Sequence, residues 1–314
     1  MERLHTRFRA LGSPCELQLV SDSRDRLEEV AERSIAELQR IEQKYSRYRD
    51  DSVVSQINAR AGTGVETRVD SETAALLDYA DTAFAQSGGL FDITSGVLRR
   101  AWDFKKVRVP AASELKALAK LVGWRKVRWR APNFLLPTAE MQIDFGGFGK
   151  EYAADRVAEL CRHAGIRSGL VDLGGDICIV GPHPDGSPWR VGIRDPKNPD
   201  RAMASIALSH GCMATSGNYE RFIEIEGKRY CHLLDPRTGW PVAGLSGVSV
   251  VADRCLIAGT ASTVAMLKGP AGPRWLTKLG LPHLWIDEDS RRGGSLWPSP
   301  DVASERPSPL ACGN

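Results

Sequence analysis

The stretch Asp144-Phe145-Gly146-Gly147-Phe148-Gly149-Lys150-Glu151-Tyr152 decides how the middle of this chain folds. It begins inside an alternating run, residues 141–145, which predicts a strand. Apolar residues at helical spacing follow it, namely Ala153, Val157, Leu160, Cys161 and Ala164. Gly165 is placed to end the helix. The stretch therefore predicts a strand joined to a helix through a glycine-rich loop.

The glycine-rich loop has the features of an anion site. Without side chains, backbone N–H groups can approach a ligand closely, and the N-terminus of the following helix favours negative charge. Lys150 adds a positive charge at the same place. A phosphate or pyrophosphate suits this combination, whereas a tight strand-to-helix turn is the alternative without a ligand. Lys150 favours the ligand, because a cation at a helix N-terminus is unfavourable unless an anion accompanies it.

Length and charge limit the classes of function. The 314 residues suffice for one large domain, or for two intertwined lobes, with a sizeable core. The net charge of +3 comes from a near-even mixture of signs, so we expect no nucleic-acid partner. The most basic run, residues 125–130, alternates charged and apolar residues and is typical of a half-exposed strand.

The chain has no apolar segment of membrane-spanning length, and its N-terminus lacks the hydrophobic core of a signal peptide. We therefore expect a cytoplasmic protein without membrane insertion. Its seven cysteines are scattered and form no Cys-x-x-Cys pair, so neither a zinc site nor a disulfide framework is predicted. Most of them lie in apolar contexts and are expected to be small buried residues.

The N-terminal part alternates strands and helices. Residues 8–20 predict a strand pair with a bend at 11–15, and an amphipathic helix follows with its apolar face from Leu27 to Tyr45. A second helix is expected over residues 71–86, ended by Gly88-Gly89. A third is expected over residues 90–100, capped by Asp92 or Thr94.

The C-terminal part is richer in strands. Residues 168–180 predict one strand interrupted by Gly174-Gly175, which indicates a bulge or the close approach of a ligand. Further strands are expected at 189–193, 204–208 and 247–251, with a hairpin of 222–225 and 230–234 around Gly227 and a helix over 254–267. No regular βαβ repeat occurs, so we predict an α+β fold with mixed or antiparallel sheets flanked by helices. We expect one domain over residues 1–288 and a disordered tail over 289–314.

Five polar clusters recur where packing alone does not ask for them: residues 46–52 with Asn58, 88–94, 144–150, 214–219 and 232–239. Together, and in this order from about Leu11 to Gly269, they resemble the ApbE family of FAD:protein FMN transferases. Two strings are specific, His-Leu-Leu-Asp-Pro-Arg-Thr-Gly (232–239) and Asp-Phe-Gly-Gly-Phe-Gly-Lys (144–150). The resemblance implies an ApbE-like architecture related to the T-fold. It also implies an enzyme that uses FAD and magnesium to transfer FMN to a threonine hydroxyl of an acceptor flavoprotein, with release of AMP.

The resemblance also assigns roles to residues of this chain. The residues expected to bind the flavin nucleotide are Leu11, Tyr48, Phe91, Asp92, Asp144, Lys150 and Leu233, with Asp144 and Lys150 beside the diphosphate. The Gly147 carbonyl and Thr263 would hold magnesium, as oxygen ligands suited to a hard cation. His232 would act as the general base, because a near-neutral imidazole can accept the proton of the acceptor hydroxyl.

Each of these residues also has a purely structural interpretation. His232 can be an ordinary strand histidine, Asp92 can merely cap a helix, and Tyr48 can pack its ring on the long helix. Asp176 can merely end a strand bulge. Residues 235–239 would make a good turn in any protein.

The chain departs from the family at the metal site. The family has an aspartate four residues before the threonine, on the same face of a helix, but this chain has Gly259 before Thr263. Asp172, Asp176 or Asp253 would have to reach in, or metal would bind more weakly through the diphosphate, Gly147 and Thr263. Otherwise the chain would bind FAD without efficient transfer, as a flavin carrier, or would hydrolyse it as an FAD pyrophosphatase. On this interpretation, Gly259→Asp should raise the affinity for magnesium.

A second and milder departure is Glu151, which stands where glycine is frequent in the family. A carboxylate at a helix start is electrostatically favourable.

Overall fold

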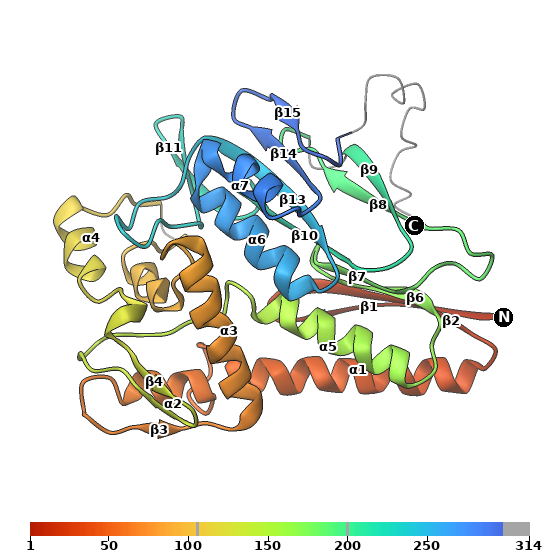
Figure 1. Cartoon of the computed structure of the whole chain (residues 1–314), viewed down its shortest axis with the longest axis horizontal. Coiled ribbons are helices and arrows are strands. Elements are labelled where there is room, and N and C mark those ends of the chain that lie inside the picture. Colours follow the sequence, from red (N-terminus) through yellow and green to blue (C-terminus); the bar gives the residue numbers. More distant parts are fainter. Residues whose placement is uncertain (105–106, 199–200, 298–314) are drawn as a thin grey trace.

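An antiparallel sheet of eight strands forms the centre of the protein in the computed structural model, which describes residues 1–104, 107–198 and 201–297 (Figure 1). Its strands lie in the order β1 (Glu2–Ala10), β2 (Ser13–Ser21), β6 (Ser168–Leu173), β7 (Ile177–Gly181), β10 (Cys212–Gly217), β13 (Leu245–Ala252), β14 (His283–Asp287) and β15 (Arg292–Gly293). All the pairings described within this sheet are antiparallel. The predicted α+β class is confirmed.

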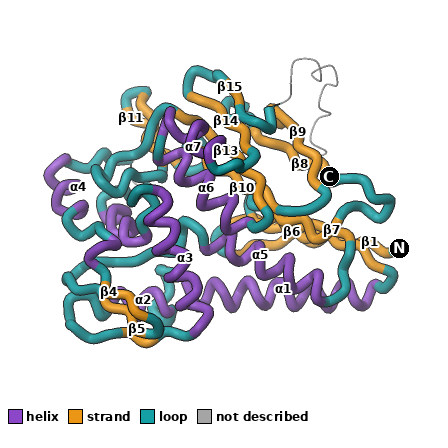
Figure 2. Tube along the Cα trace, in the orientation of Figure 1, coloured by secondary structure: helices purple, strands orange, loops and turns teal. Residues whose placement is uncertain are grey.

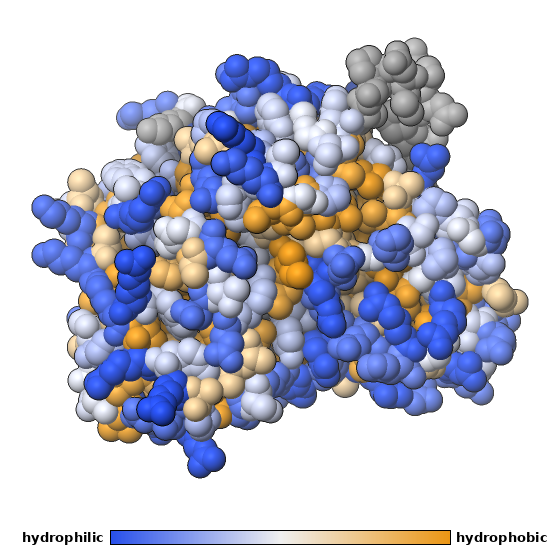
Figure 3. All heavy atoms as spheres, in the orientation of Figure 1, coloured by the Kyte–Doolittle hydropathy of each residue, from blue (hydrophilic) through white to orange (hydrophobic). Residues whose placement is uncertain are grey.

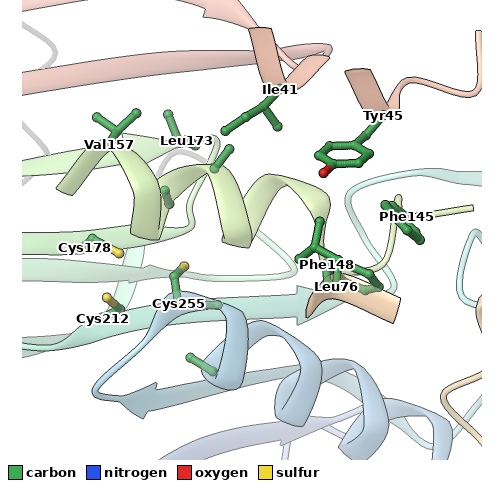
Figure 4. Close-up of a cluster of buried hydrophobic side chains, with 14 of the residues drawn as sticks. Ile41, Tyr45, Leu76, Phe145, Phe148, Val157, Leu173, Cys178, Cys212 and Cys255 are labelled. Atoms are coloured by element: carbon green, nitrogen blue, oxygen red, sulfur yellow. The ribbon is translucent and has the colours of Figure 1, made fainter. Parts of the chain in front are cut away.

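Three helices pack side by side along the central sheet. The helix α1 (Arg24–Tyr45) contacts β1 and α5 (Gly149–His163), and α5 contacts β6, β7 and α6 (Cys255–Leu267). The helix α6 in turn contacts β10 and β13. Figure 2 shows α1 and α5 as neighbouring helices beside the strands. Buried residues from these helices and from the sheet form the main core, which includes Ile41, Phe148, Val157 and Leu173 (Figure 4).

A hairpin of β8 (Trp189–Arg194) and β9 (Ala202–Leu208) builds a second, smaller apolar cluster. It packs Trp189 and Ile206 against sheet residues such as Ile179 and Met213. Two separate clusters of apolar side chains therefore pack against the central sheet, one from the helices and one from this hairpin. The chain passes from α6 to β14 through the 3-10 turn η3 (Gly269–Ala271) and the helix α7 (Gly272–Lys278). The helix α7 contacts both α6 and β14.

Five further helical elements are found among the described residues. They are α2 (Val53–Ala59), α3 (Ser71–Ser87), the 3-10 helix η1 (Ile93–Arg100), α4 (Ala112–Ala119) and the 3-10 turn η2 (Trp124–Lys126). A small sheet of β3 (Thr67–Arg68), β5 (Asn133–Leu135) and β4 (Arg128–Arg130) lies with them, and β11 (Phe222–Ile225) pairs with β12 (Lys228–Cys231). A third cluster of buried residues around Trp102 joins η1 and α4 to β11 through Ile223.

Several local predictions are confirmed. The bend expected at 11–15 is present as a tight turn of Leu11 and Gly12, which have φ angles of 53° and 70°, and residues 13–15 already belong to β2. The helix α1 begins at the N-cap Ser23 and buries Leu27, Leu38 and Ile41 on one face. The helix α3 ends at Gly88, which has a left-handed conformation. The hairpin around Gly227 and the helix over residues 255–267 are also present.

The predicted strand at 141–145 is wrong. Its alternation is real, since Met141, Ile143 and Phe145 are buried, but the segment joins no sheet. Its backbone is satisfied by other groups. The Asn58 side chain takes up both polar groups of Ile143, and the Asp144 N–H donates to the Ile93 carbonyl. The alternation therefore predicted correctly which side chains are buried, but it predicted the wrong hydrogen-bond partners for the backbone.

Four other element boundaries need correction. Residues 168–180 form two antiparallel strands, because Gly174 and Gly175, with φ of 68° and 94°, turn the chain back. The segment 90–100 is a 3-10 helix that begins at Ile93. The strand expected at 230–234 ends at Cys231, and the run 125–130 divides into η2 and β4.

Residues 289–297, the first part of the tail expected to be disordered, are described and contain strand β15. Strand β15 pairs with β14, and the Leu296 N–H donates to the His283 carbonyl. Residues 298–314 lie outside the described residues, and the single domain over residues 1–288 stays a prediction.

No helix in the described ranges has both the length and the apolar character needed to cross a membrane. Hydrophilic side chains are spread over the face shown in Figure 3 and alternate with smaller apolar areas. This distribution agrees with the near-even mixture of charges in the sequence.

Candidate active site

The glycine-rich loop is anchored through Asp144. One carboxylate oxygen of Asp144 accepts a hydrogen bond from the Gly146 N–H at 2.8 Å. The other lies 2.9 Å from Nη1 of Arg47 and 3.9 Å from Nε of Arg99. Arg47 also donates to the Gly96 carbonyl at 3.0 Å. Asp144 thus fixes the loop and holds two guanidinium groups beside it.

Lys150 lies in the first turn of α5, as the sequence predicted. No side chain caps this N-terminus, so the helix start offers its backbone N–H groups. The Lys150 ammonium lies 2.7 Å from Oδ2 of Asp176, whose side chain is 5% exposed. Burial acts to lower the pKa of Lys150, but the charges of Asp176 and Glu151 outweigh it and raise that pKa above its usual value. Lys150 is therefore a fixed positive charge at the helix start.

His232 follows β12 and is half-buried. Its Nδ1 lies 3.2 Å from the Arg221 carbonyl oxygen, which can only accept, so Nδ1 carries the proton. In this neutral tautomer Nε2 keeps the lone pair with which an imidazole accepts a proton. Burial, and then the charge of Arg99, lower the pKa of His232 to about 4. The imidazole is therefore neutral at physiological pH.

Three predicted flavin contacts lie on turns. Leu11 is in the turn between β1 and β2, where its N–H donates to Glu42 at 3.0 Å. Tyr48 follows α1 and is 82% exposed, so it does not pack on that helix. Leu233 lies next to His232, and its carbonyl accepts from the Val242 N–H at 2.9 Å. Of the three, Tyr48 presents the largest free surface to a ligand.

Phe91 and Asp92 have different surroundings. Phe91 is buried. A Cβ atom added at Gly147 would lie 3.4 Å from the Phe91 ring, so the ring packs against the glycine-rich loop. Asp92 caps η1: one oxygen accepts from the N–H and the hydroxyl of Thr94, and the other accepts from the Trp124 N–H. Burial raises the pKa of Asp92, against these hydrogen bonds. The structural interpretation accounts for the whole carboxylate.

The predicted magnesium ligands come from two packed elements. Gly147 belongs to the loop before α5, and Thr263 belongs to α6. The Thr263 hydroxyl lies 3.0 Å from Oγ of Ser216 on β10, which fixes its position. A buried carboxylate oxygen, Oε2 of Glu151, has no hydrogen-bond partner among the described residues. Hydroxyl, carbonyl and carboxylate oxygens are the donors that a hard cation prefers, so the residues present fit magnesium.

Sequence reasoning missed two charged groups of this site. Arg99 lies in the last turn of η1 and contributes to the low pKa of His232. Glu151 was interpreted only as a favourable charge at a helix start, yet it is buried. The signal for Arg99 was weak, because an arginine in the last turn of a helix is common on surfaces. For Glu151 the signal was that the chain gains a carboxylate at position 151 and lacks the expected one at position 259.

A buried group of cysteines was also not predicted. Sγ of Cys178, Sγ of Cys212 and a carboxylate oxygen of Asp155 lie within 4.8 Å of one another, close to Cys255 (Figure 4). The carboxylate oxygens of Asp155 accept hydrogen bonds from the N–H groups of Cys255 and Leu256, at the start of α6. This arrangement caps a helix inside the core. The six described cysteines are free and buried, whereas Cys312 lies outside the described residues.

Two surface cavities lie away from these residues. One, of about 450 Å³, is lined by Glu37, Arg40, Ser71, Glu72, Tyr152 and Arg156. The other, of about 350 Å³, is lined by Arg100, Ala101, Asp103 and Arg108. Neither includes a predicted site residue.

Solved structures of similar fold place the chain in a class of enzymes. The ApbE protein of Thermotoga maritima is 30% identical with a TM-score of 0.86, and the match covers 94% of this chain and 97% of that one. The flavin transferase ApbE of Vibrio cholerae is 25% identical with a TM-score of 0.82, over 94% and 97% of the two chains. The chain thus has the fold of the flavin transferases.

The chain matches the ApbE family over residues 11–285, and it belongs to that family. A relative from Treponema pallidum, named FAD:protein FMN transferase, is 34% identical over 251 residues, which are 74% of this chain and 69% of the relative. A relative of the same name from Escherichia coli K12 is 31% identical over 258 residues, with 77% and 72% covered. The resemblance inferred from the motifs is confirmed.

Proposed function

We propose that the chain is an FAD:protein FMN transferase that moves FMN from FAD to a threonine hydroxyl of an acceptor flavoprotein and releases AMP, with magnesium. The observation that carries the proposal is the similarity to enzymes of that name over about three quarters of the chain. The arrangement around the glycine-rich loop supports it, because phosphoryl transfer needs a positioned diphosphate, neutralised oxygens and an activated hydroxyl.

The proposed diphosphate site combines fixed charges with backbone donors. Lys150 stands at the uncapped start of α5, and Arg47 and Arg99 are held nearby by Asp144. These groups would bind the two phosphates and would stabilise the charge that develops on their oxygens. Because Asp144 and Asp176 already orient them, they need little reorganisation when FAD binds.

His232 would supply the base. Its Nε2 would accept the proton of the threonine hydroxyl while the hydroxyl oxygen attacks the phosphorus of the FMN half. A new phosphorus–oxygen bond to threonine forms as the bond to the bridging oxygen breaks, and AMP leaves with that electron pair. The hydrogen bond to the Arg221 carbonyl keeps the ring in the tautomer that this step requires.

Magnesium, when bound, would neutralise phosphate oxygens, and Gly147 and Thr263 are proposed to hold it. Tyr48, Leu11, Phe91 and Leu233 are proposed to contact the flavin nucleotide. The role of Asp92 would be to hold the Phe91 segment in place, since its carboxylate caps η1.

The test uses the full chain with FAD, Mg²⁺ and an acceptor flavoprotein that carries an exposed threonine. We expect the acceptor to gain the mass of FMN less one water and an equal amount of AMP to appear. AMP without a modified acceptor would indicate an FAD pyrophosphatase, and intact bound FAD would indicate a carrier; either result would contradict the proposal. The identity of the acceptor and the cytoplasmic location stay predictions.

A further inference from the structure

The helix α6 has a glycine, Gly259, at the position where a carboxylate is expected in this family. Gly259 and Thr263 are four residues apart and therefore lie on one face of α6. A side-chain carbon built at Gly259 would lie 2.4 Å from Cγ and 2.7 Å from Oε1 of Glu151. Non-bonded carbon atoms do not approach so closely. The Glu151 side chain therefore occupies the space that a side chain at position 259 would need.

Glu151 reaches this space from the neighbouring helix. It lies in the first turn of α5, next to Lys150, and α5 packs against α6. Only 9% of the residue is exposed, and its Oε2 has no hydrogen-bond partner among the described residues. A buried carboxylate without a partner is costly, so its retention here calls for a ligand.

The neighbouring lysine does not fill this role. The Lys150 ammonium lies 2.7 Å from Asp176, on the turn between β6 and β7. Lys150 is therefore already paired with Asp176, and Oε2 of Glu151 is left without a hydrogen-bond partner among the described residues.

The other carboxylates considered for this site are used elsewhere. Asp172 accepts a hydrogen bond from the Gly175 N–H at 2.7 Å and so closes the turn between β6 and β7. Asp253 is exposed and precedes the N-cap of α6, so it lies more than one helical turn before position 259. Asp176 is paired with Lys150.

We infer that Glu151 is the carboxylate ligand of the metal site, supplied from α5 in place of a side chain at position 259 on α6. The inference rests on the proposed function, in which Gly147 and Thr263 contribute the other protein oxygens. It makes Glu151 and Gly259 an exchanged pair: the acidic side chain has moved to the facing helix, and glycine makes room for it. The chain then keeps one carboxylate for a divalent cation, as such sites ordinarily require.

Metal binding tests this inference apart from catalysis. Mn²⁺ is titrated into the full chain, alone and with FAD, and bound Mn²⁺ is followed by electron paramagnetic resonance; competition with Mg²⁺ identifies the shared site. Outer ligands of metal sites commonly contribute about 10–100-fold to affinity, so Glu151→Gln, which removes an inner one, should weaken Mn²⁺ binding at least about tenfold. Glu159→Gln, another acid of α5, should bind Mn²⁺ as the original chain does.

The double variant Glu151→Gly with Gly259→Asp returns the carboxylate to α6 and should recover most of the lost Mn²⁺ affinity. It also keeps the test decisive if Glu151→Gln fails to fold. Unchanged Mn²⁺ binding in Glu151→Gln, or no Mn²⁺ binding in the original chain, would overturn the inference. If Mn²⁺ binding depends on Glu151 but no FMN reaches the acceptor, the proposed function fails and the ligand assignment stands.

Discussion

Asn58 binds Ile143 as a neighbouring strand would. Its amide oxygen accepts from the Ile143 N–H at 2.7 Å, and its amide nitrogen donates to the Ile143 carbonyl at 3.0 Å. One side chain thus replaces a strand partner directly before the glycine-rich loop. The loop owes its position to a residue more than eighty positions away in the sequence.

Replacing Asn58 should loosen this loop. Asn58→Leu removes both hydrogen bonds and leaves buried polar groups of Ile143 without partners, so we expect about 2–3 kcal/mol lower free energy of unfolding. Urea denaturation measures this difference, and FAD titration should show weaker binding. Gln56→Ala in the same helix loses only an exposed bond to the Asp51 carbonyl and should stay within about 0.5 kcal/mol. Equal stability of the Asn58 and Gln56 variants would contradict the anchoring role.

The sequence predicted burial better than it predicted partners. The alternation of residues 141–145 correctly indicated which side chains are buried, because alternation follows from exposure of one face. It carried no information about what satisfies the backbone, and a side-chain amide from α2 took the place of a strand. In residues 168–180 the paired glycines marked a reversal of the chain, and composition alone does not separate a bulge from a tight turn.

The candidate site was only partly accessible from the sequence. The glycine-rich loop, Lys150 and His232 were identifiable because motifs carried them. The contact between Glu151 and Gly259 was not, because it depends on how α5 packs on α6, more than a hundred residues apart. The assignment of Asp92 to the flavin nucleotide rests on the motif and stays a prediction, and its carboxylate also caps η1, as the local sequence already suggested.

Tyr48 separates ligand binding from stability. Its ring is 82% exposed, so Tyr48→Ala should change the free energy of unfolding by less than about 0.5 kcal/mol. If the ring contacts the flavin nucleotide, FAD binding measured by fluorescence quenching should weaken clearly. Val65→Ala, at another exposed apolar residue, provides the control and should leave FAD affinity unchanged. Unaltered FAD affinity in Tyr48→Ala would remove Tyr48 from the binding site.

The pH dependence of transfer should reflect the low pKa of His232. In the free protein this pKa is about 4, so the imidazole stays unprotonated and able to accept a proton well below its usual value of about 6.5. We therefore expect kcat/KM to show no loss due to His232 between pH 7 and 5.5 and to fall only toward pH 4. His232→Ala should bind FAD but lose transfer, by about 10²–10⁴-fold.

The same shift has a consequence for stability. The unfolded chain binds a proton at His232 near pH 6.5 and the folded chain only near pH 4, so stability falls as the pH drops through this window. His232→Asn should reduce this fall in urea denaturation series at pH 7, 6 and 5. A kcat/KM profile that instead breaks near pH 6.5 would show that the imidazole titrates normally.

Lys150 and Asp176 should behave as a coupled pair. Lys150→Met leaves the buried Asp176 carboxylate without its partner and should lower the free energy of unfolding by about 3 kcal/mol at neutral pH. Burial already raises the pKa of Asp176, and loss of Lys150 raises it further, so the deficit should grow as the pH rises and shrink in acid.

The double variant Lys150→Met with Asp176→Asn should cost less than Lys150→Met alone, since no uncompensated charge remains. Arg24→Met, which breaks an exposed pair with Glu28, should cost at most about 0.5 kcal/mol. Asp176→Asn is measured alone as well. If the stability losses of Lys150→Met and Asp176→Asn add up to the loss in the double variant, the pair is not coupled.

Gly259→Asp shows how the structure revises an expectation from the sequence. The residue pattern alone predicted a gain in magnesium affinity, but the new Cβ would lie 2.4 Å from Cγ of Glu151. The single change should therefore lower the free energy of unfolding by about 1–3 kcal/mol through overpacking, and Glu151→Gly in the same chain should relieve most of that loss. Gly149→Ala is the matched control, because its Cβ would meet only Cβ of Phe145 at an ordinary 3.7 Å. Thermal denaturation of these three variants and of the original chain, all without metal, measures these differences. Gly259→Asp as stable as the original chain would mean that Glu151 can leave this space freely, and the exchange between the two helices would lose its steric basis.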